Sequence, residues 1–75
     1  MKFRDKMIEA MREHAKGHIA KHKMNVEVYF RNAAGIGGDG NADILEEIEK
    51  ELDIVAKYDD QLEMLDKYFS EDIVH

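Results

Sequence analysis

The sequence predicts an all-α protein: an antiparallel two-helix hairpin with a Gly-rich loop, which dimerises into a four-helix bundle. Two long segments carry apolar residues at steps of three and four, the spacing of one helical face. Between them, NAAGIGGDG contains four of the five glycines, a density that no regular helix tolerates. We therefore expect residues 1–75 to form a single domain, with helix 2–31, loop 32–40, helix 41–69 and a frayed tail over 70–75.

The first segment places its apolar residues on one predicted helical face, which Phe3 and Met7 extend toward the N-terminus. The members of this face are Ile8, Met11, Ala15, Ile19, His22, Val26 and Tyr29. Gly17 lies inside the pattern and costs about 1 kcal/mol relative to alanine in a helix. It either lets a partner helix approach closely or simply weakens the middle of the segment.

Residues 25–30 fit two periodicities. Val26, Val28 and Phe30 alternate as they would in a strand, whereas Val26, Tyr29 and Phe30 continue the helical face. Nothing after residue 31 alternates, so a strand here would have no pairing partner within the chain, and its backbone groups would be left unsatisfied. We therefore expect the helix to continue to about Arg31.

The second helix is predicted to start at Asn41 or Asp43, either of which can cap its first turn. Its apolar face consists of Leu45, Ile48, Leu52, Val55, Tyr58, Leu62, Leu65 and Phe69. Ile44, Ile54 and Met64 broaden this face beyond what one neighbouring helix would cover. The breadth predicts self-association, with the homodimer as its simplest form.

Composition limits the classes of protein that the chain can belong to. It has 75 residues and no cysteine, so disulfides and thiolate metal sites are excluded. No apolar run approaches the roughly 18 residues of a membrane span. The beginning of the chain carries charges where a signal peptide needs an apolar stretch. We expect a cytoplasmic protein that does not interact with membranes.

Charge is distributed unevenly along the chain. Residues 1–31 carry eight Lys or Arg against four acids, and residues 32–75 carry three Lys against thirteen acids. Oppositely charged helices favour pairing with each other. The first helix is also a candidate nucleic-acid-binding element, although its basic residues spread around the helix rather than forming a stripe, and the acidic half repels phosphate. The residues that would bind nucleic acid are Lys2, Arg4, Lys6, Arg12, Lys16, Lys21 and Lys23.

His14, His18 and His22 form the candidate metal site. Spacings of four place successive imidazoles on one helical face, within reach of a shared ion. The outer two lie about 12 Å apart along the axis, so one ion cannot bind all three, and carboxylates of the second helix would have to complete a site. The alternative is that the histidines border the helix interface and hydrogen-bond to acids. If the loop centres near Ile36, we also expect His18 to face Ile54 and His14 to face Tyr58 and Asp59.

Catalysis is not predicted. GIGGDG matches the glycine pattern of dinucleotide-binding loops, but the strands on either side that such a loop requires are missing, so a plain turn is the better interpretation. The calcium-loop pattern fails because Ile44 and Lys50 stand where glycine and glutamate are needed. A two-helix protein also offers little concavity for a paired-carboxylate site. We expect no enzymatic activity and no cofactor.

The segments KHKMNVEVYF, GIG and DILEEIEKELDIVAKYDDQLEMLDKYF resemble a group of short uncharacterised proteins of marine tailed phages, particularly myovirus-type phages of cyanobacteria. The resemblance covers nearly the whole chain, although the loop GIGGDGNAD is longer and richer in glycine than in that group. It implies a phage origin, a host cytoplasm and no established activity, and it assigns no functional residues. The resulting expectation is a small accessory protein that binds itself and a phage or host protein.

Overall fold

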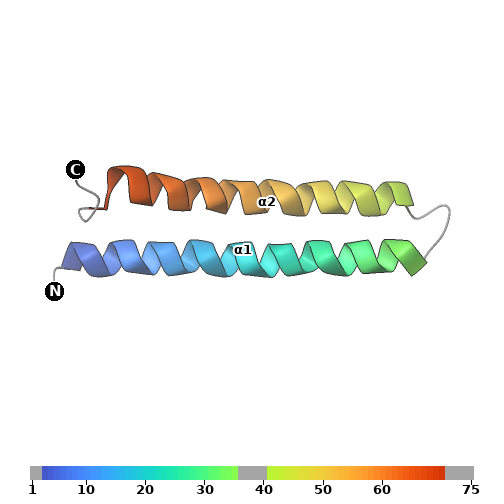
Figure 1. Ribbon diagram of the computed structural model, residues 1–75, viewed down its shortest axis with the longest axis horizontal. Helices are drawn as coiled ribbons and strands as arrows, with labels where there is room; N and C mark the ends of the chain where they lie inside the picture. The colour runs from blue at the N-terminus through green and yellow to red at the C-terminus, as the bar shows by residue number, and fades with distance from the viewer. Residues whose placement is uncertain (1–2, 36–40, 71–75) are drawn as a thin grey trace.

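The computed structural model describes residues 3–35 and 41–70, and it leaves the side chains of residues 33–35, 41 and 42 undescribed. Helix α1 (Phe3–Gly35) and helix α2 (Asn41–Tyr68) lie side by side and run in opposite directions (Figure 1). The molecule measures 54 × 20 × 14 Å along its principal axes. The prediction of an all-helical hairpin is confirmed. The predicted tail, apart from Ser70, falls outside the described residues.

Helix α1 is longer than the sequence predicts. Residues 25–30 are helical, as expected, but the helix continues through Asn32 to Gly35, so the predicted loop start at residue 32 was wrong. Two alanines follow Asn32, and alanine is the strongest helix former, which explains the extra turn. The rest of the predicted loop, residues 36–40, lies outside the described part of the chain.

Helix α2 starts at Asn41, as predicted, and ends one residue before the predicted end at Phe69. The backbone N–H of Phe69 still donates to the carbonyl of Leu65 at 3.0 Å, so the last turn closes onto this residue. None of the helices in the described residues is long and apolar enough to cross a membrane.

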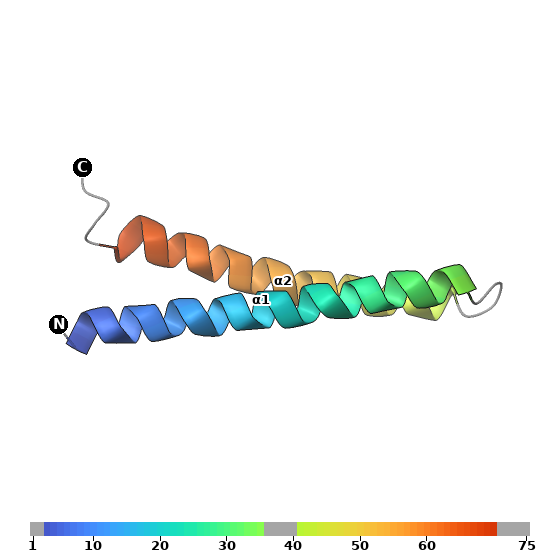
Figure 2. The same cartoon turned by 60° about the horizontal axis from the view of Figure 1, so that its bottom comes forward.

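The two helices meet along a heptad interface, in which buried and half-buried residues alternate at steps of four and three. On α1 the interface residues are Ile8, Arg12, Ala15, Ile19, His22, Val26 and Tyr29. On α2 they are Ile44, Ile48, Glu51, Val55, Tyr58, Leu62 and Leu65. In Figure 2 the helices cross obliquely, as helices joined by such an interface do.

This interface is rotated from the predicted apolar faces. Arg12 replaces Met11 on α1, and Ile44 and Glu51 replace Leu45 and Leu52 on α2. Leu45 is 62% exposed and Leu52 is 50% exposed, so both were wrongly predicted to face α1. A prediction based on apolar residues leaves charged residues out of the interface. Arg12 and Glu51 can nevertheless lie there, because Arg12 pairs with Asp66 and Glu51 with His22 of the other helix.

The core is small. Among the described residues only Ala15, Val26 and Ile48 are buried hydrophobic residues, and no large side chain is fully buried. Phe3 and Met7, predicted to extend the interface of α1, are instead 77% and 53% exposed. A single hairpin therefore leaves much of its apolar surface in water.

Candidate functional site

The three histidines of α1 form a row, and two of them contact one tyrosine of α2. The ring of His18 stacks on Tyr58 with centroids 4.4 Å apart. The ring of His14 makes a T-shaped contact with each of these two rings, its centroid 4.5 Å from that of His18 and 5.7 Å from that of Tyr58. The ring of His22 lies parallel to that of His18, with the two centroids 6.0 Å apart. The expected contact between His14 and Tyr58 is confirmed. His18, expected to face Ile54, instead stacks on Tyr58, one helical turn further along α2.

His22 is tied to α2 by a polar network. Its Nδ1 lies 2.5 Å from Oε1 of Glu51, and Asn25 Nδ2 donates to the same oxygen at 3.0 Å. The two interacting side chains of His22 and Glu51 are only 13% and 15% exposed. The hydrogen bond from His22, and then that from Asn25, lower the pKa of Glu51, although burial opposes them. The carboxylate is therefore held in its charged form at the helix interface.

His18 is the least satisfied of the three histidines. Its Nδ1 is buried without a hydrogen-bond partner. Burial lowers the pKa of His18, and the neighbouring His14, His22, Lys21 and Lys57 lower it further. The imidazole of His18 is therefore neutral at pH 7 and acts as a flat ring stacked on Tyr58.

A metal site would have to recruit ligands beyond the positions seen in the structure. The side chains of residues 3–32 and 43–70 form no group of three or more His, Asp or Glu that could hold a metal ion as placed. His14, His18 and His22 do lie in one row, but His22 is engaged with Glu51. Metal binding by these histidines stays a prediction.

The basic residues of α1 do not form one stripe. Arg12 pairs with Asp66 of α2, and Lys16 pairs with Glu13 in its own helix. Arg4 donates to the carbonyl oxygen of Phe69 at 3.3 Å. Arg4, Arg12 and Lys16 therefore bind groups within the hairpin. Lys2 lies outside the described residues. Nucleic-acid binding gains no support from this arrangement.

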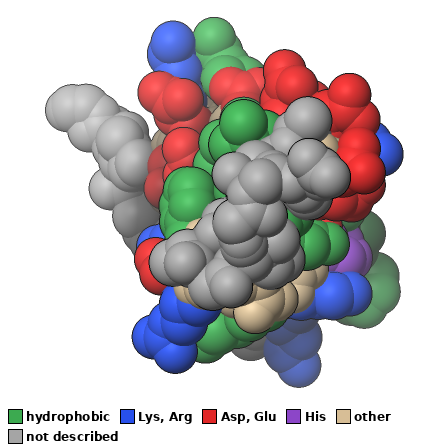
Figure 3. All heavy atoms as spheres, turned by 90° about the vertical axis from the view of Figure 1, so that its right-hand side faces the viewer, with side chains coloured by type: hydrophobic (Ala, Val, Ile, Leu, Met, Phe, Trp, Pro, Cys, Tyr) green, Lys and Arg blue, Asp and Glu red, His purple; other side chains and the backbone are tan. Residues whose placement is uncertain are grey.

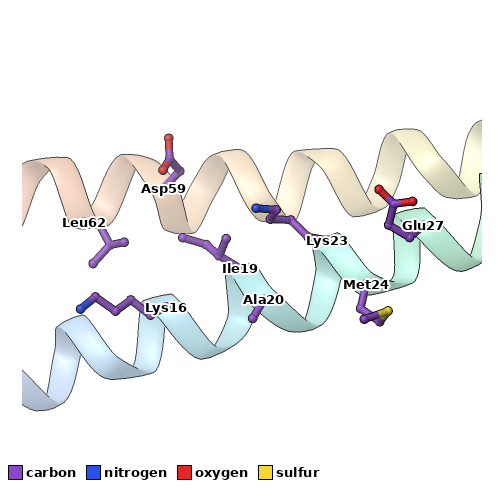
Figure 4. A pocket seen from close by; sticks show the side chains of 8 residues that line it. All are labelled: Lys16, Ile19, Ala20, Lys23, Met24, Glu27, Asp59 and Leu62. Carbon is purple, nitrogen blue, oxygen red and sulfur yellow. The ribbon is translucent and has the colours of Figure 1, made fainter.

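The pockets of the hairpin that the described residues line are open grooves at its surface. One of about 560 Å³ lies where Ile19 of α1 approaches Leu62 of α2, with Lys16, Lys23 and Asp59 on its walls (Figure 4). Another, of about 410 Å³, lies near the two chain ends and is almost wholly apolar. Its lining consists of Phe3, Arg4, Met7, Ile8, Met11, Leu65 and Phe69. Neither groove brings together a nucleophile and a base.

Many large apolar side chains are exposed on the hairpin. Ten large hydrophobic residues are between 47% and 77% exposed. They are Phe3, Met7, Met11, Met24, Val28, Phe30, Leu45, Leu52, Tyr68 and Phe69. Several of them are predicted from the sequence to lie in the hairpin's own interface, because the apolar residues of α1 follow two faces and only one of these packs on α2.

Fold and surface together define the chain as a helical hairpin of the antiparallel coiled-coil type. Comparison with protein-family models, with curated proteins and with solved structures found no match to it. The comparisons therefore lend no support to the resemblance to phage proteins.

Proposed function

We propose that this chain is a small self-associating helical interaction protein without enzymatic activity. The observation that carries the proposal is the imbalance between its buried and exposed apolar residues, three against ten among the described residues. Fully burying one large apolar side chain contributes about 1.5 to 3 kcal/mol, so covering several of the ten would stabilise a complex substantially. Exposed apolar surface of this extent typically marks a protein–protein contact.

Sedimentation velocity over a wide range of concentration tests self-association. We expect a species of twice the chain mass that dissociates on dilution, with helicity falling as it does so. A fully helical monomer at every concentration would refute the proposal.

The partner beyond a second copy is proposed from the resemblance to phage proteins: a phage or host protein in the cytoplasm of an infected cell. An exposed helical face suits such a role because a partner helix can lie along it. Capture of the same protein by the wild-type chain, and not by variants with polar residues on the exposed face, tests this proposal.

Metal binding is a second candidate function, and the close approach of His14 to His18 favours it. Their ring centroids are 4.5 Å apart, and the buried Nδ1 of His18 has no partner. Two imidazoles four residues apart on a helix can hold Zn²⁺ or Ni²⁺ when water or other ligands complete the shell. We expect either ion to raise the melting temperature of the wild-type chain and not of His14→Ala. An unchanged melting temperature in the wild type would end this candidate.

A further inference from the structure

Helix α1 carries a second heptad stripe outside its interface with α2, although His14 in this stripe also contacts Tyr58 of α2. From Phe3 onward, exposed residues follow one another at the same alternating steps of four and three that mark the helix interface. We call these residues the back stripe: Phe3, Met7, Ala10, His14, Gly17, Lys21, Met24 and Val28. Six of the eight are apolar or small, and every one is exposed. The corresponding outer positions of α2 include Glu46, Asp53 and Asp60, which are charged.

Gly17, at the centre of the back stripe, serves no packing purpose within the hairpin. A Cβ at Gly17 would meet no atom within 4 Å beyond its neighbours and its own helical backbone. Glycine nevertheless costs about 1 kcal/mol relative to alanine inside a helix. A glycine in this position removes the side chain that would keep a second helix at a distance.

We propose that the back stripe of α1 binds the same stripe of a second copy, antiparallel, with the two Gly17 residues crossing on the two-fold axis. This inference rests on the proposed self-association and identifies the surface that carries it. A two-fold axis brings one patch against itself, so the patch must be self-complementary in size and charge. Residue size within the back stripe bears on the first requirement, and charged residues beside the stripe bear on the second.

Residue sizes match across the proposed axis. An antiparallel heptad pairing about Gly17 places Met24 opposite the partner's Ala10, so a large side chain meets a small one. It places Met7 opposite the partner's Val28, and Phe3 near the partner's Arg31, where a guanidinium can lie over the aromatic ring. Met7, Met24 and Val28 are 53%, 62% and 47% exposed in the single hairpin and would all be covered.

Charges also match. The same pairing brings exposed Lys6 beside the partner's exposed Glu27, and it does so twice in the dimer. On the larger scale, α1 carries seven Lys or Arg against four acids, whereas α2 carries ten acids against three Lys. Figure 3 shows this division: acidic side chains crowd the upper half, where α2 lies, and most basic ones lie below. Joining two copies through α1 keeps the two acidic helices on the outside, far from each other.

A membrane surface is the competing occupant of an exposed apolar face with basic neighbours. The back stripe fits a helix better, because His14, Gly17 and Lys21 interrupt its apolar character in the middle. A bilayer gains nothing from a glycine there, whereas a crossing helix gains close approach.

Gly17→Glu is the first test. Glutamate is a better helix former than glycine, so the hairpin should keep or gain helicity, while two glutamates meeting on the axis should weaken the dimer at least about tenfold. Ala56→Glu, which adds the same charge at an exposed position of α2, is the matched control and should leave dimerisation unchanged. Sedimentation velocity measures the dimer, and circular dichroism measures the helix content.

A charge exchange between copies is the second test. Lys6 and Glu27 lie about 30 Å apart along one helix, so they cannot pair within a chain. Lys6→Glu alone and Glu27→Lys alone should each weaken the homodimer, because each creates two like-charged contacts. Mixed together, the two variants should form a heterodimer in preference to either homodimer, which native mass spectrometry resolves.

The outcomes separate the inference from the proposal beneath it. If the Gly17→Glu variant dimerises as tightly as the wild type, the back-stripe interface is refuted and self-association still stands. The same holds if Lys6→Glu and Glu27→Lys form homodimers and heterodimers without preference. A wild-type chain that stays monomeric at all concentrations would overturn both. Binding of that monomer to vesicles containing phosphatidylserine, but not to neutral vesicles, would assign the back stripe to a membrane surface instead.

Discussion

Ile48→Ala is the substitution that should destabilise the hairpin most clearly. Ile48 is 5% exposed, in the middle of the α2 side of the interface. Truncating a buried isoleucine to alanine costs 2 to 5 kcal/mol in well-packed cores, and a two-helix interface can partly close over the gap, so we expect about 2 to 3 kcal/mol. In a domain of this size, that corresponds to a fall of about 10 to 20 °C in melting temperature.

Leu52→Ala is the matched control, since it removes a side chain of similar size from the same helix. Leu52 is 50% exposed, so its truncation should cost below about 1 kcal/mol. Thermal unfolding followed by circular dichroism, at one fixed protein concentration, compares the two variants. Equal losses for Ile48→Ala and Leu52→Ala would refute the observed heptad interface and favour the apolar face read from the sequence.

Three further predictions concern the polar groups of the interface. Burial and nearby cations lower the pKa of His18, so the unfolded chain binds a proton more readily than the folded one. The free energy of unfolding should therefore fall as the pH drops below about 6.5. In thermal melts, His18→Phe should flatten that part of the pH profile. The pKa of Glu51 is lowered, so its carboxylate stabilises the folded chain at pH values above the ordinary carboxyl pKa, and this stabilisation is lost as the pH falls and the folded group is protonated. Glu51→Gln should remove this dependence on acid pH. A pH profile identical to that of the wild type would contradict the His22 contact. Arg12→Leu should raise unfolding free energy by about 1 kcal/mol in urea titrations, because it exchanges a partly exposed ion pair with Asp66 for apolar packing, and a loss of stability would show that the pair matters more than we infer.

The two helices and their antiparallel arrangement could be predicted from the sequence, because periodic apolar residues and clustered glycines act locally. The extra turn over Asn32–Gly35 was not predicted, because the cluster of glycines placed the predicted end of the first helix at Arg31. The two alanines after Asn32 favour a helix and extend it. The rotation of the interface was missed for a different reason. Glu51 is acceptable at an interface position only because His22 and Asn25 reach it, and such partners belong to another helix.

The candidate site was only partly predictable. The spacing of the histidines placed them in one row, and the register of the hairpin placed His14 against Tyr58. The stacking of His18 on the same ring could not be derived from spacing, because it depends on side-chain rotamers. The back stripe is not evident from the sequence, because Phe3 and Met7 are predicted to extend the interface, whereas strict heptad steps from Phe3 follow a different face of the helix.

The contact between His22 and Glu51 bears on how the two helices find their alignment. A heptad interface repeats every seven residues, so an apolar hairpin can slide by one repeat and still bury similar surface. Here such a slip would bring Glu51 against Ala15 or Tyr29 and strip its carboxylate of both hydrogen bonds. Leaving a charged group unpaired at an interface is costly, so the slipped forms are disfavoured. The polar network thus selects one alignment among several that the apolar residues alone would accept.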